Sequence, residues 1–302
     1  MTRRTPKPDL SPQAQSAFDA YSHYLKESVD LRPATIRNYL SDLRQFIAWF
    51  ERQHDHPFHP DQVTTPTLTA YRLYLKDDLD RKPSTINRHL VTLKRYFAWT
   101  TERGEIARDP AKPVRLVGEE SNTPRHMADT DEQALLASVE RSQNERDITI
   151  IKLMLHTGLR AGEVCGLRWD QVVLHKRSGY LKIWGKRNKY REVPLNRTSR
   201  ATLNDFHQQC TNPDGVVFRS VKTGEALTTR ALGFIVKKYA QRANLDVRPH
   251  DLRHRFGYRM AQTTPLHRLA QIMGHDSLDT TLRYVQATRG DLQRDVEQIA
   301  WE

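Results

Sequence analysis

Six residues that suit phosphoryl transfer lie in a fixed order along the second half of this 302-residue chain. They are Arg160, Lys186, His250, Arg253, His275 and Tyr284. The unperturbed pKa of a tyrosine phenol is about 10, so a phenol that attacks at neutral pH must lose its proton or have its anion stabilised. The phosphoryl transition state carries negative charge on its non-bridging oxygens, which preorganised donors must meet. Fixed cations around one tyrosine therefore predict transfer of a phosphoryl group to the phenol oxygen.

Each residue type in this set suits one step of breaking a DNA strand without a metal ion. Arginine binds two phosphate oxygens at once and stays charged, so Arg160 and Arg253 are predicted to clamp the phosphate. The pKa of lysine falls readily in a desolvated or cationic setting, so Lys186 is predicted to protonate the leaving 5′-oxygen. Histidine titrates near neutrality. His250 and His275 are therefore candidates to take the phenol proton or to hydrogen-bond the phosphate.

The rest of the chain predicts two domains that position these residues, because 302 residues exceed the usual size of one core. Apolar residues recur at helical spacing after Pro33, and the pattern of residues 33–50 returns at 83–100. This internal repeat predicts a compact four-helix domain. The second domain is predicted to contain further helices and a β-hairpin over 180–195 whose basic turn carries Lys186. The expected boundaries are a flexible basic leader at 1–10, a helical DNA-binding domain at 11–104, an extended interdomain linker at 105–127 and a catalytic domain at 128–302.

The charge of the chain predicts a polyanionic partner. The net charge is +12 and the isoelectric point about 9.8, and both halves carry an excess of lysine and arginine. The alternative interpretation is a solvated basic surface without a partner. The candidate phosphate contacts are Arg37, Arg44, Arg88, Lys94 and Arg95 on the repeated helices, with Arg187 and Lys189 on the hairpin turn. Two cysteines without metal-binding spacing, together with the lack of an apolar run of about 20 residues, predict a cytoplasmic protein.

Taken together, these motifs resemble the tyrosine recombinase (phage-integrase-like) family, most closely its compact Xer-type members. The resemblance implies a mainly α fold with a small β-sheet or hairpin (α+β), built from an N-terminal four-helix SAM-like core-binding domain and a catalytic domain. It implies that Tyr284 forms a covalent 3′-phosphotyrosyl intermediate with DNA, and that Glu163 supports the site by orienting its neighbours. The motifs that carry the resemblance lie at residues 157–163, 185–189, 250–254 and 274–284.

The resemblance also implies how such a protein works on DNA. A site-specific recombinase cuts duplex DNA at two short inverted-repeat sites and exchanges strands between them, with four protomers assembled on the two sites. It needs no cofactor, metal ion or ATP, although an accessory protein can take part. An apolar stripe in residues 290–302 is expected to dock on a neighbouring protomer. From the short leader we expect no separate arm-binding domain.

Two departures from the family pattern and three different functions stay open. The turn at 260–265 lacks the usual glycine, and Arg255 replaces a small residue, either as an extra phosphate contact or as a surface arginine. His250 and His254 are spaced as in zinc hydrolases, but Asp251 stands where those enzymes have glutamate. The remaining two functions are a catalytically silent DNA-binding regulator and a type IB topoisomerase, which shares the chemistry.

Overall fold

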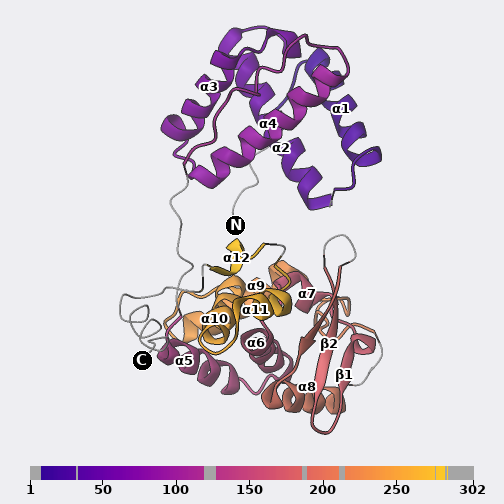
Figure 1. Cartoon of the computed structure of the whole chain (residues 1–302), viewed down its shortest axis with the longest axis vertical. Coiled ribbons are helices and arrows are strands. Elements are labelled where there is room, and N and C mark those ends of the chain that lie inside the picture. The colour runs from indigo at the N-terminus through magenta and orange to yellow at the C-terminus, as the bar shows by residue number, and fades with distance from the viewer. Residues whose placement is uncertain are drawn as a thin grey trace, which may run out of the picture. The chain divides into compact units, whose positions relative to one another are not determined.

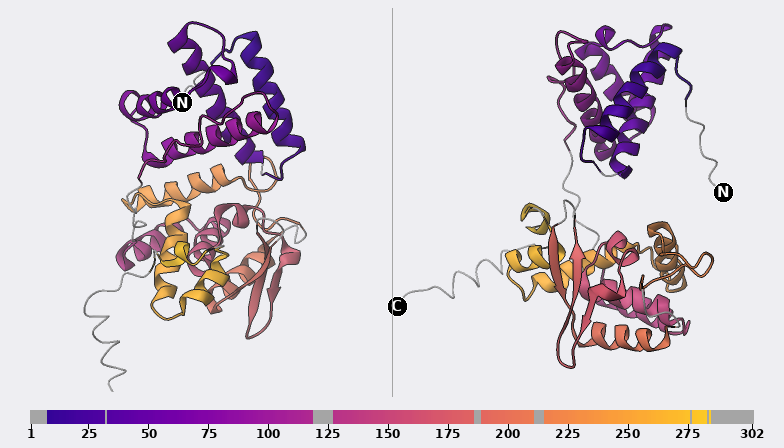
Figure 2. Two further views of the ribbon diagram at one scale, coloured as in Figure 1. Left: turned by 45° about the horizontal axis from the view of Figure 1, so that its top comes forward. Right: turned by 90° about the vertical axis from the view of Figure 1, so that its right-hand side faces the viewer.

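The computed structural model describes residues 8–31, 33–118, 127–185, 189–210, 215–275, 277–282 and 284 (Figures 1 and 2). The chain divides into two compact units, Met1–Asn122 and Thr123–Glu302. Each unit has a hydrophobic core of its own. Helices dominate, with a three-stranded antiparallel sheet of order β1-β2-β3 in the second unit. The predicted fold class is confirmed.

The N-terminal unit is built from the helices that the repeat predicted. A proline in the first turn of each helix presets the backbone dihedral and needs no donor there, and the Ser11 side chain caps the first helix by accepting from the Ala14 N–H. Aromatic side chains such as Phe46 and Tyr96 fill the centre of this unit. The α-helices are α1 (Pro12–Glu27), α2 (Pro33–His54), α3 (Thr65–Leu73) and α4 (Pro83–Glu102).

The two repeated helices, α2 and α4, meet at equivalent positions of the repeat. Thr92 donates to the Asp42 carboxylate at 3.2 Å, and the two residues are fifty apart. Asp42 is 1% exposed and also pairs with Arg88 on α4. The next residue, His89, has its Nε2 atom 3.3 Å from the same carboxylate and its Nδ1 atom 3.1 Å from the Tyr71 hydroxyl. These buried polar contacts fix how α2 crosses α4.

Acid is expected to weaken the N-terminal unit through His89. Burial, and then the charge of Arg88, lowers the pKa of His89 from about 6.5 to about 4. The unfolded chain therefore binds a proton that the folded chain rejects, and stability is lost as the pH falls from about 6.5 toward 4. The expected loss between pH 7.5 and 5.5 is about 1 to 1.5 kcal/mol.

Urea unfolding followed by circular dichroism measures this loss. The His89→Gln variant removes the titrating group, so its stability should change less over the same pH interval. An equal change in both proteins would contradict the assignment to His89.

The segment after α4 differs from the predicted extended linker. Ala111 and Val114 are buried in the N-terminal core. Lys94 Nζ donates to the Ala111 carbonyl at 2.7 Å, and the Asn87 amide group exchanges two hydrogen bonds with the backbone of Val117. Side chains of α4 thus take up backbone groups that have no helical or strand partner, which periodicity cannot reveal. The first part of the linker, up to residue 118, belongs to the N-terminal unit, whereas residues 119–126 lie outside the described ranges.

The C-terminal unit packs its helices around α6, against which α5, α8 and α10 lie (Figure 1). The hairpin predicted over 180–195 is present as β2 and β3, with Trp184 opposite Tyr190. The helices are α5 (Asp129–Glu140), α6 (Glu145–Thr157), α7 (Ala161–Cys165), α8 (Arg197–Gln209), α9 (Thr229–Arg242), α10 (Pro249–Ala261), α11 (Leu266–Met273) and α12 (Asp279–Leu282). The strands are β1 (Val172–Leu174), β2 (Gly179–Trp184) and β3 (Tyr190–Pro194).

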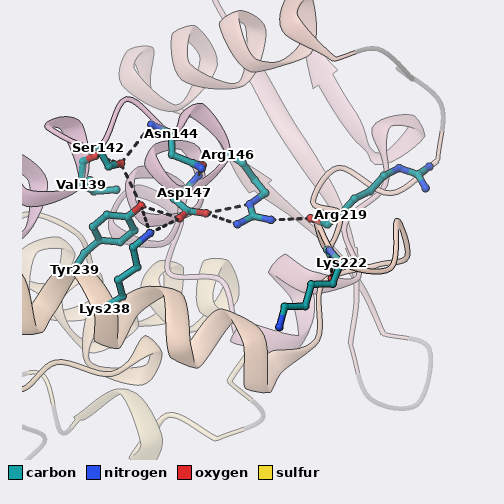
Figure 3. A network of polar contacts seen from close by, with 10 residues as sticks. Val139, Ser142, Asn144, Arg146, Asp147, Arg219, Lys222, Lys238 and Tyr239 are labelled. Carbon is teal, nitrogen blue, oxygen red and sulfur yellow. Dashed lines mark hydrogen bonds and ion pairs between the residues drawn. The ribbon is translucent and has the colours of Figure 1, made fainter.

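A buried carboxylate anchors the start of α6 (Figure 3). Asp147 is 2% exposed and accepts from the Tyr239 hydroxyl of α9 at 2.8 Å and from the Arg146 guanidinium at 2.7 Å. Arg146 also donates to the carbonyl of Arg219, and the Asn144 side chain caps the helix. These contacts tie α6 to α9 at the end of α6 that lies away from the candidate site residues.

Candidate active site

A left-handed turn after α6 positions the first arginine. Gly158 has φ +62°, and a β-carbon built there would lie 2.3 Å from the Phe256 ring of α10. Only glycine therefore fits, because both the dihedral and the space exclude a side chain. Arg160 follows as the N-cap residue of α7, where its N–H donates to the Glu163 carboxylate at 2.8 Å. The Arg160 guanidinium donates to the Glu163 carboxylate at 3.0 Å and to the Gly274 carbonyl at 2.7 Å.

Helix α10 presents the second arginine from the interior of the unit. Arg253 is 2% exposed and donates to the Gly158 carbonyl at 2.5 Å and to the Met273 carbonyl at 2.8 Å. Burial, followed by the charge of Arg160, lowers the pKa of Arg253 to about 10. This value lies well above neutrality, so the guanidinium stays charged at pH 7 and remains able to meet an anion.

The candidate nucleophile is buried against α10. Tyr284 is 5% exposed, and its hydroxyl oxygen lies 2.9 Å from Nδ1 of His254. Its ring packs on Gly257, where a built β-carbon would lie 2.7 Å from the phenol carbon Cζ, and edge-on against Tyr258. The ring of His275 is nearly parallel to that of Tyr284, at 6.2 Å between centroids. His254, which sequence reasoning did not select, thus contacts the phenol oxygen.

The structure brings three of the six predicted catalytic residues to one turn, 273–275. Arg160 and Arg253 bind its carbonyls, and His275 closes it, with Nδ1 2.8 Å from the Thr281 hydroxyl. The exposed ring of His250 lies at 4.2 Å from that of His254, centroid to centroid. Lys186 and Arg187 lie outside the described residues. Lys189 is exposed, and its carbonyl accepts from the Gly185 N–H at 2.7 Å, which closes the hairpin.

Glu163 joins Arg160 to Arg191, a residue of the sheet. Burial alone raises the pKa of Glu163, but the hydrogen bonds and charge of Arg191, with those of Arg160, outweigh burial and hold this pKa below its ordinary value. Glu163 is therefore an anion at neutral pH. The supporting role predicted for it fits these contacts. Arg191 on β3 was not selected from the sequence, because nothing in its local pattern distinguishes it from other strand arginines.

The candidate phosphate contacts of the N-terminal unit fall into two groups. Arg37 and Arg95 are exposed, and the Arg95 guanidinium lies over the Tyr39 ring. The other three are less exposed and form hydrogen bonds or ion pairs within the unit: Arg88 pairs with Asp42, Lys94 binds the carbonyls of the segment after α4, and Arg44 donates to Gln15 and lies over the Phe18 ring.

Both sequence interpretations of Arg255, as a phosphate contact or as a surface arginine, are wrong. Arg255 is 4% exposed rather than a surface or phosphate-facing residue. Its guanidinium donates to Glu132 at 2.6 Å and to the Met127 carbonyl at 2.9 Å, and it pairs with Asp129. Arg255 thus ties α10 to the first helix of the unit. The acceptors lie more than 120 residues away in sequence, so local context could not predict them.

Two further features concern metal binding and membranes. Within the described ranges, no group of three or more His, Cys, Asp or Glu side chains is arranged to hold a metal ion. None of the described helices combines the length and apolar character needed to cross a bilayer.

Comparison with known proteins relates this arrangement to a family. The profile of the phage integrase family matches residues 125–290, and that of the phage integrase N-terminal SAM-like domain matches residues 18–104. The chain is 32% identical over 201 residues to tyrosine recombinase XerD of Pseudomonas aeruginosa, covering 63% of this chain and 66% of that protein. It is 28% identical over 283 residues to tyrosine recombinase XerD of Lacticaseibacillus casei, covering 90% and 94%.

Solved structures show the same fold at lower identity. The Tn1549 transposon integrase in complex with circular intermediate DNA superposes with a TM-score of 0.73 at 19% identity, covering 93% of this chain and 98% of that one. XerH site-specific recombinase bound to difH substrate gives a TM-score of 0.72 at 17% identity, with 97% of both chains covered. The resemblance noted in the motifs is confirmed across both units: the chain belongs to the phage integrase family of tyrosine recombinases, and to its Xer-type branch.

Proposed function

We propose that this chain is a site-specific DNA recombinase that cuts and rejoins duplex DNA through a 3′-phosphotyrosyl intermediate on Tyr284. One observation carries the proposal: the Tyr284 hydroxyl is held by a histidine beside the turn that Arg160 and Arg253 bind. The family's named relatives are tyrosine recombinases, and solved relatives are bound to recombination-site DNA.

The chemistry follows from these groups. The Tyr284 oxygen attacks the scissile phosphorus, a bond forms between them, and the bond from phosphorus to the 5′-oxygen breaks. His254 accepts the phenol proton, and Lys186 gives a proton to the leaving 5′-oxygen, a role that the family resemblance implies. Arg160 and Arg253 neutralise the non-bridging oxygens as charge develops. Attack by the 5′-hydroxyl of a partner strand reverses the sequence and releases Tyr284, so no ATP is consumed.

The proposal includes the setting of the reaction. The partner is duplex DNA, and four protomers act on two inverted-repeat sites in the cytoplasm, with or without an accessory protein. Basic side chains of both units contact the phosphates, so affinity falls steeply with salt. The proposed contacts are Arg37, Arg44, Arg88, Lys94, Arg95, Arg187 and Lys189. The docking tail, 290–302, lies outside the described residues.

An adduct assay tests the function. A pool of nicked duplexes with randomised inverted repeats is incubated with the protein in EDTA, and adducts stable to SDS are recovered and sequenced. Mass spectrometry of the protease-treated adduct should place the DNA on the peptide that contains Tyr284. A recovered adduct would also argue against the zinc hydrolase hypothesis, because EDTA removes the metal ion that such an enzyme needs. Sequence-specific binding without any adduct would favour the catalytically silent regulator, and relaxation of supercoiled DNA without strand exchange would favour a topoisomerase.

Replacing His254 by asparagine is expected to slow cleavage by about 10²-fold or more, since a positioned general base contributes on that order. The asparagine amide can still hydrogen-bond the phenol but cannot take its proton. Single-turnover cleavage of the recovered site measures the change, and DNA affinity should stay constant. His267→Asn, on the exposed face of α11, is the control. If His254→Asn cleaved at the wild-type rate, the contact between His254 and the Tyr284 hydroxyl would have no role in proton transfer.

A further inference from the structure

Three arginines converge on three consecutive carbonyls at the end of α11. Arg191 donates to Ile272, Arg253 to Met273 and Arg160 to Gly274, at 3.0, 2.8 and 2.7 Å. The last carbonyls of a helix lack intrahelical donors and form the negative end of its dipole, so cations stabilise them. Two of these arginines belong to the proposed phosphate clamp, whereas the third, Arg191, has no role assigned by the proposed function.

Arg191 is directed inward. Its side chain is 10% exposed, and its Nη1 and Nη2 atoms donate to the two oxygens of Glu163 at 3.0 and 2.9 Å. With Nε on the Ile272 carbonyl, all three of its nitrogens are engaged with the protein. Such a side-by-side pair has a fixed geometry, because both the guanidinium and the carboxylate are planar. Arg191 is therefore placed to orient other groups rather than to bind a phosphate.

The turn that leads to His275 is shaped around this guanidinium. Gly274 has φ +66°, and a β-carbon built there would lie 2.9 Å from Cζ of Arg191. The Gly274 backbone thus lies against the Arg191 guanidinium, and its carbonyl accepts from Arg160. A shift of Arg191 would therefore move both the Glu163 carboxylate that holds Arg160 and the turn that carries His275.

We propose that Arg191 is a positioning residue of the active site. Through Glu163 and the Ile272 carbonyl, it holds Arg160 and the turn of His275 in the arrangement that binds the scissile phosphate. This inference rests on the proposed function. Lysine cannot replace Arg191, because one ammonium group on a flexible stem cannot bind both carboxylate oxygens in parallel and reach the carbonyl as well.

The test compares two substrates at the recovered site. One carries the ordinary scissile phosphate, and the other a methylphosphonate, in which a methyl group replaces one non-bridging oxygen and removes its charge. Arg191→Lys is expected to cleave the phosphate substrate about 10²-fold more slowly than wild type, the effect of a misplacement near 1 Å. The loss on the methylphosphonate should be clearly smaller, as it should be for Arg160→Lys, because that substrate needs less charge neutralisation. DNA affinity should stay constant.

Arg200→Lys is the matched control. Arg200 is half-buried and donates to the Leu195 carbonyl at 2.9 Å, next to the end of β3, without contacting Glu163 or the turn in the described part of the chain. Its cleavage of both substrates should stay near wild type. A purely structural role of Arg191 would lower cleavage of the two substrates by the same factor, and this result would overturn the proposal. A loss of DNA affinity that matches the loss of cleavage would instead make Arg191 a direct DNA contact, and would also overturn it.

Glu163→Gln alters the acceptor of the same hydrogen bonds, and it provides the test if the Arg191→Lys variant does not fold. It should show the same dependence on substrate, and the double variant should be no slower than the slower single variant, because both changes break one connection. If the two single losses of cleavage rate added up in the double variant, Arg191 and Glu163 would act independently, which would contradict the proposal. The two proposals can fail separately: no wild-type adduct overturns the proposed function and the inference with it, whereas a wild-type adduct with undiminished cleavage by Arg191→Lys overturns the inference alone.

Discussion

Replacing Tyr284 by phenylalanine is expected to abolish the covalent DNA adduct while leaving the fold and DNA binding intact. The substitution removes only the attacking oxygen. The ring keeps its packing on Gly257, against Tyr258 and beside His275. The lost hydrogen bond to His254 costs about 1 kcal/mol of folding stability, which a protein of this size tolerates. Gel analysis in SDS measures the adduct, and band shift measures DNA binding.

Tyr258→Phe is the matched control, because this tyrosine lies on α10 with its ring 5.3 Å from that of Tyr284. It should form the adduct as wild type does. If Tyr284→Phe still formed the adduct, the nucleophile would lie elsewhere, and the assignment of the reaction to the buried phenol would be wrong.

Replacing Arg253 by lysine is expected to slow cleavage by about 10²- to 10³-fold, the usual cost of losing one preorganised donor to a developing anion. The stability of the C-terminal unit should also fall by about 1 to 3 kcal/mol. Both effects have one cause. The guanidinium spans the Gly158 and Met273 carbonyls from a site that is 2% exposed, and one ammonium cannot satisfy both carbonyls and a phosphate.

Single-turnover cleavage at saturating protein separates chemistry from binding, and thermal unfolding reports the stability. The control is Arg259→Lys on the same helix, where the side chain is 56% exposed and pairs with Glu132. It should change neither quantity much. Wild-type cleavage by Arg253→Lys would show that a cation of any shape suffices and would refute the two-carbonyl explanation.

The chemistry of this protein could be predicted from the sequence because its signals are local. Arg160, Arg253, His275 and Tyr284 each lie in a short motif whose residue types and spacing suit a role, and helical periodicity with the internal repeat predicts the mainly helical fold. The hairpin over 180–195 followed from a basic turn between two β-prone runs. Glu163 was selected through the family resemblance, as the acidic residue of the motif at 157–163.

The contacts between these motifs were decided only by the tertiary structure. His254 holds the phenol, and Arg191 supports Glu163, because helices and a strand distant in sequence meet at the end of α11. Arg255 is buried because α10 packs against α5, whose residues lie far away in sequence, and the segment up to residue 118 packs on α4 although it has no periodicity. A side chain's local sequence gives its chemical type and its element, but its burial and its partners depend on which surfaces pack together. These surfaces are set by the whole core rather than by neighbours in the chain.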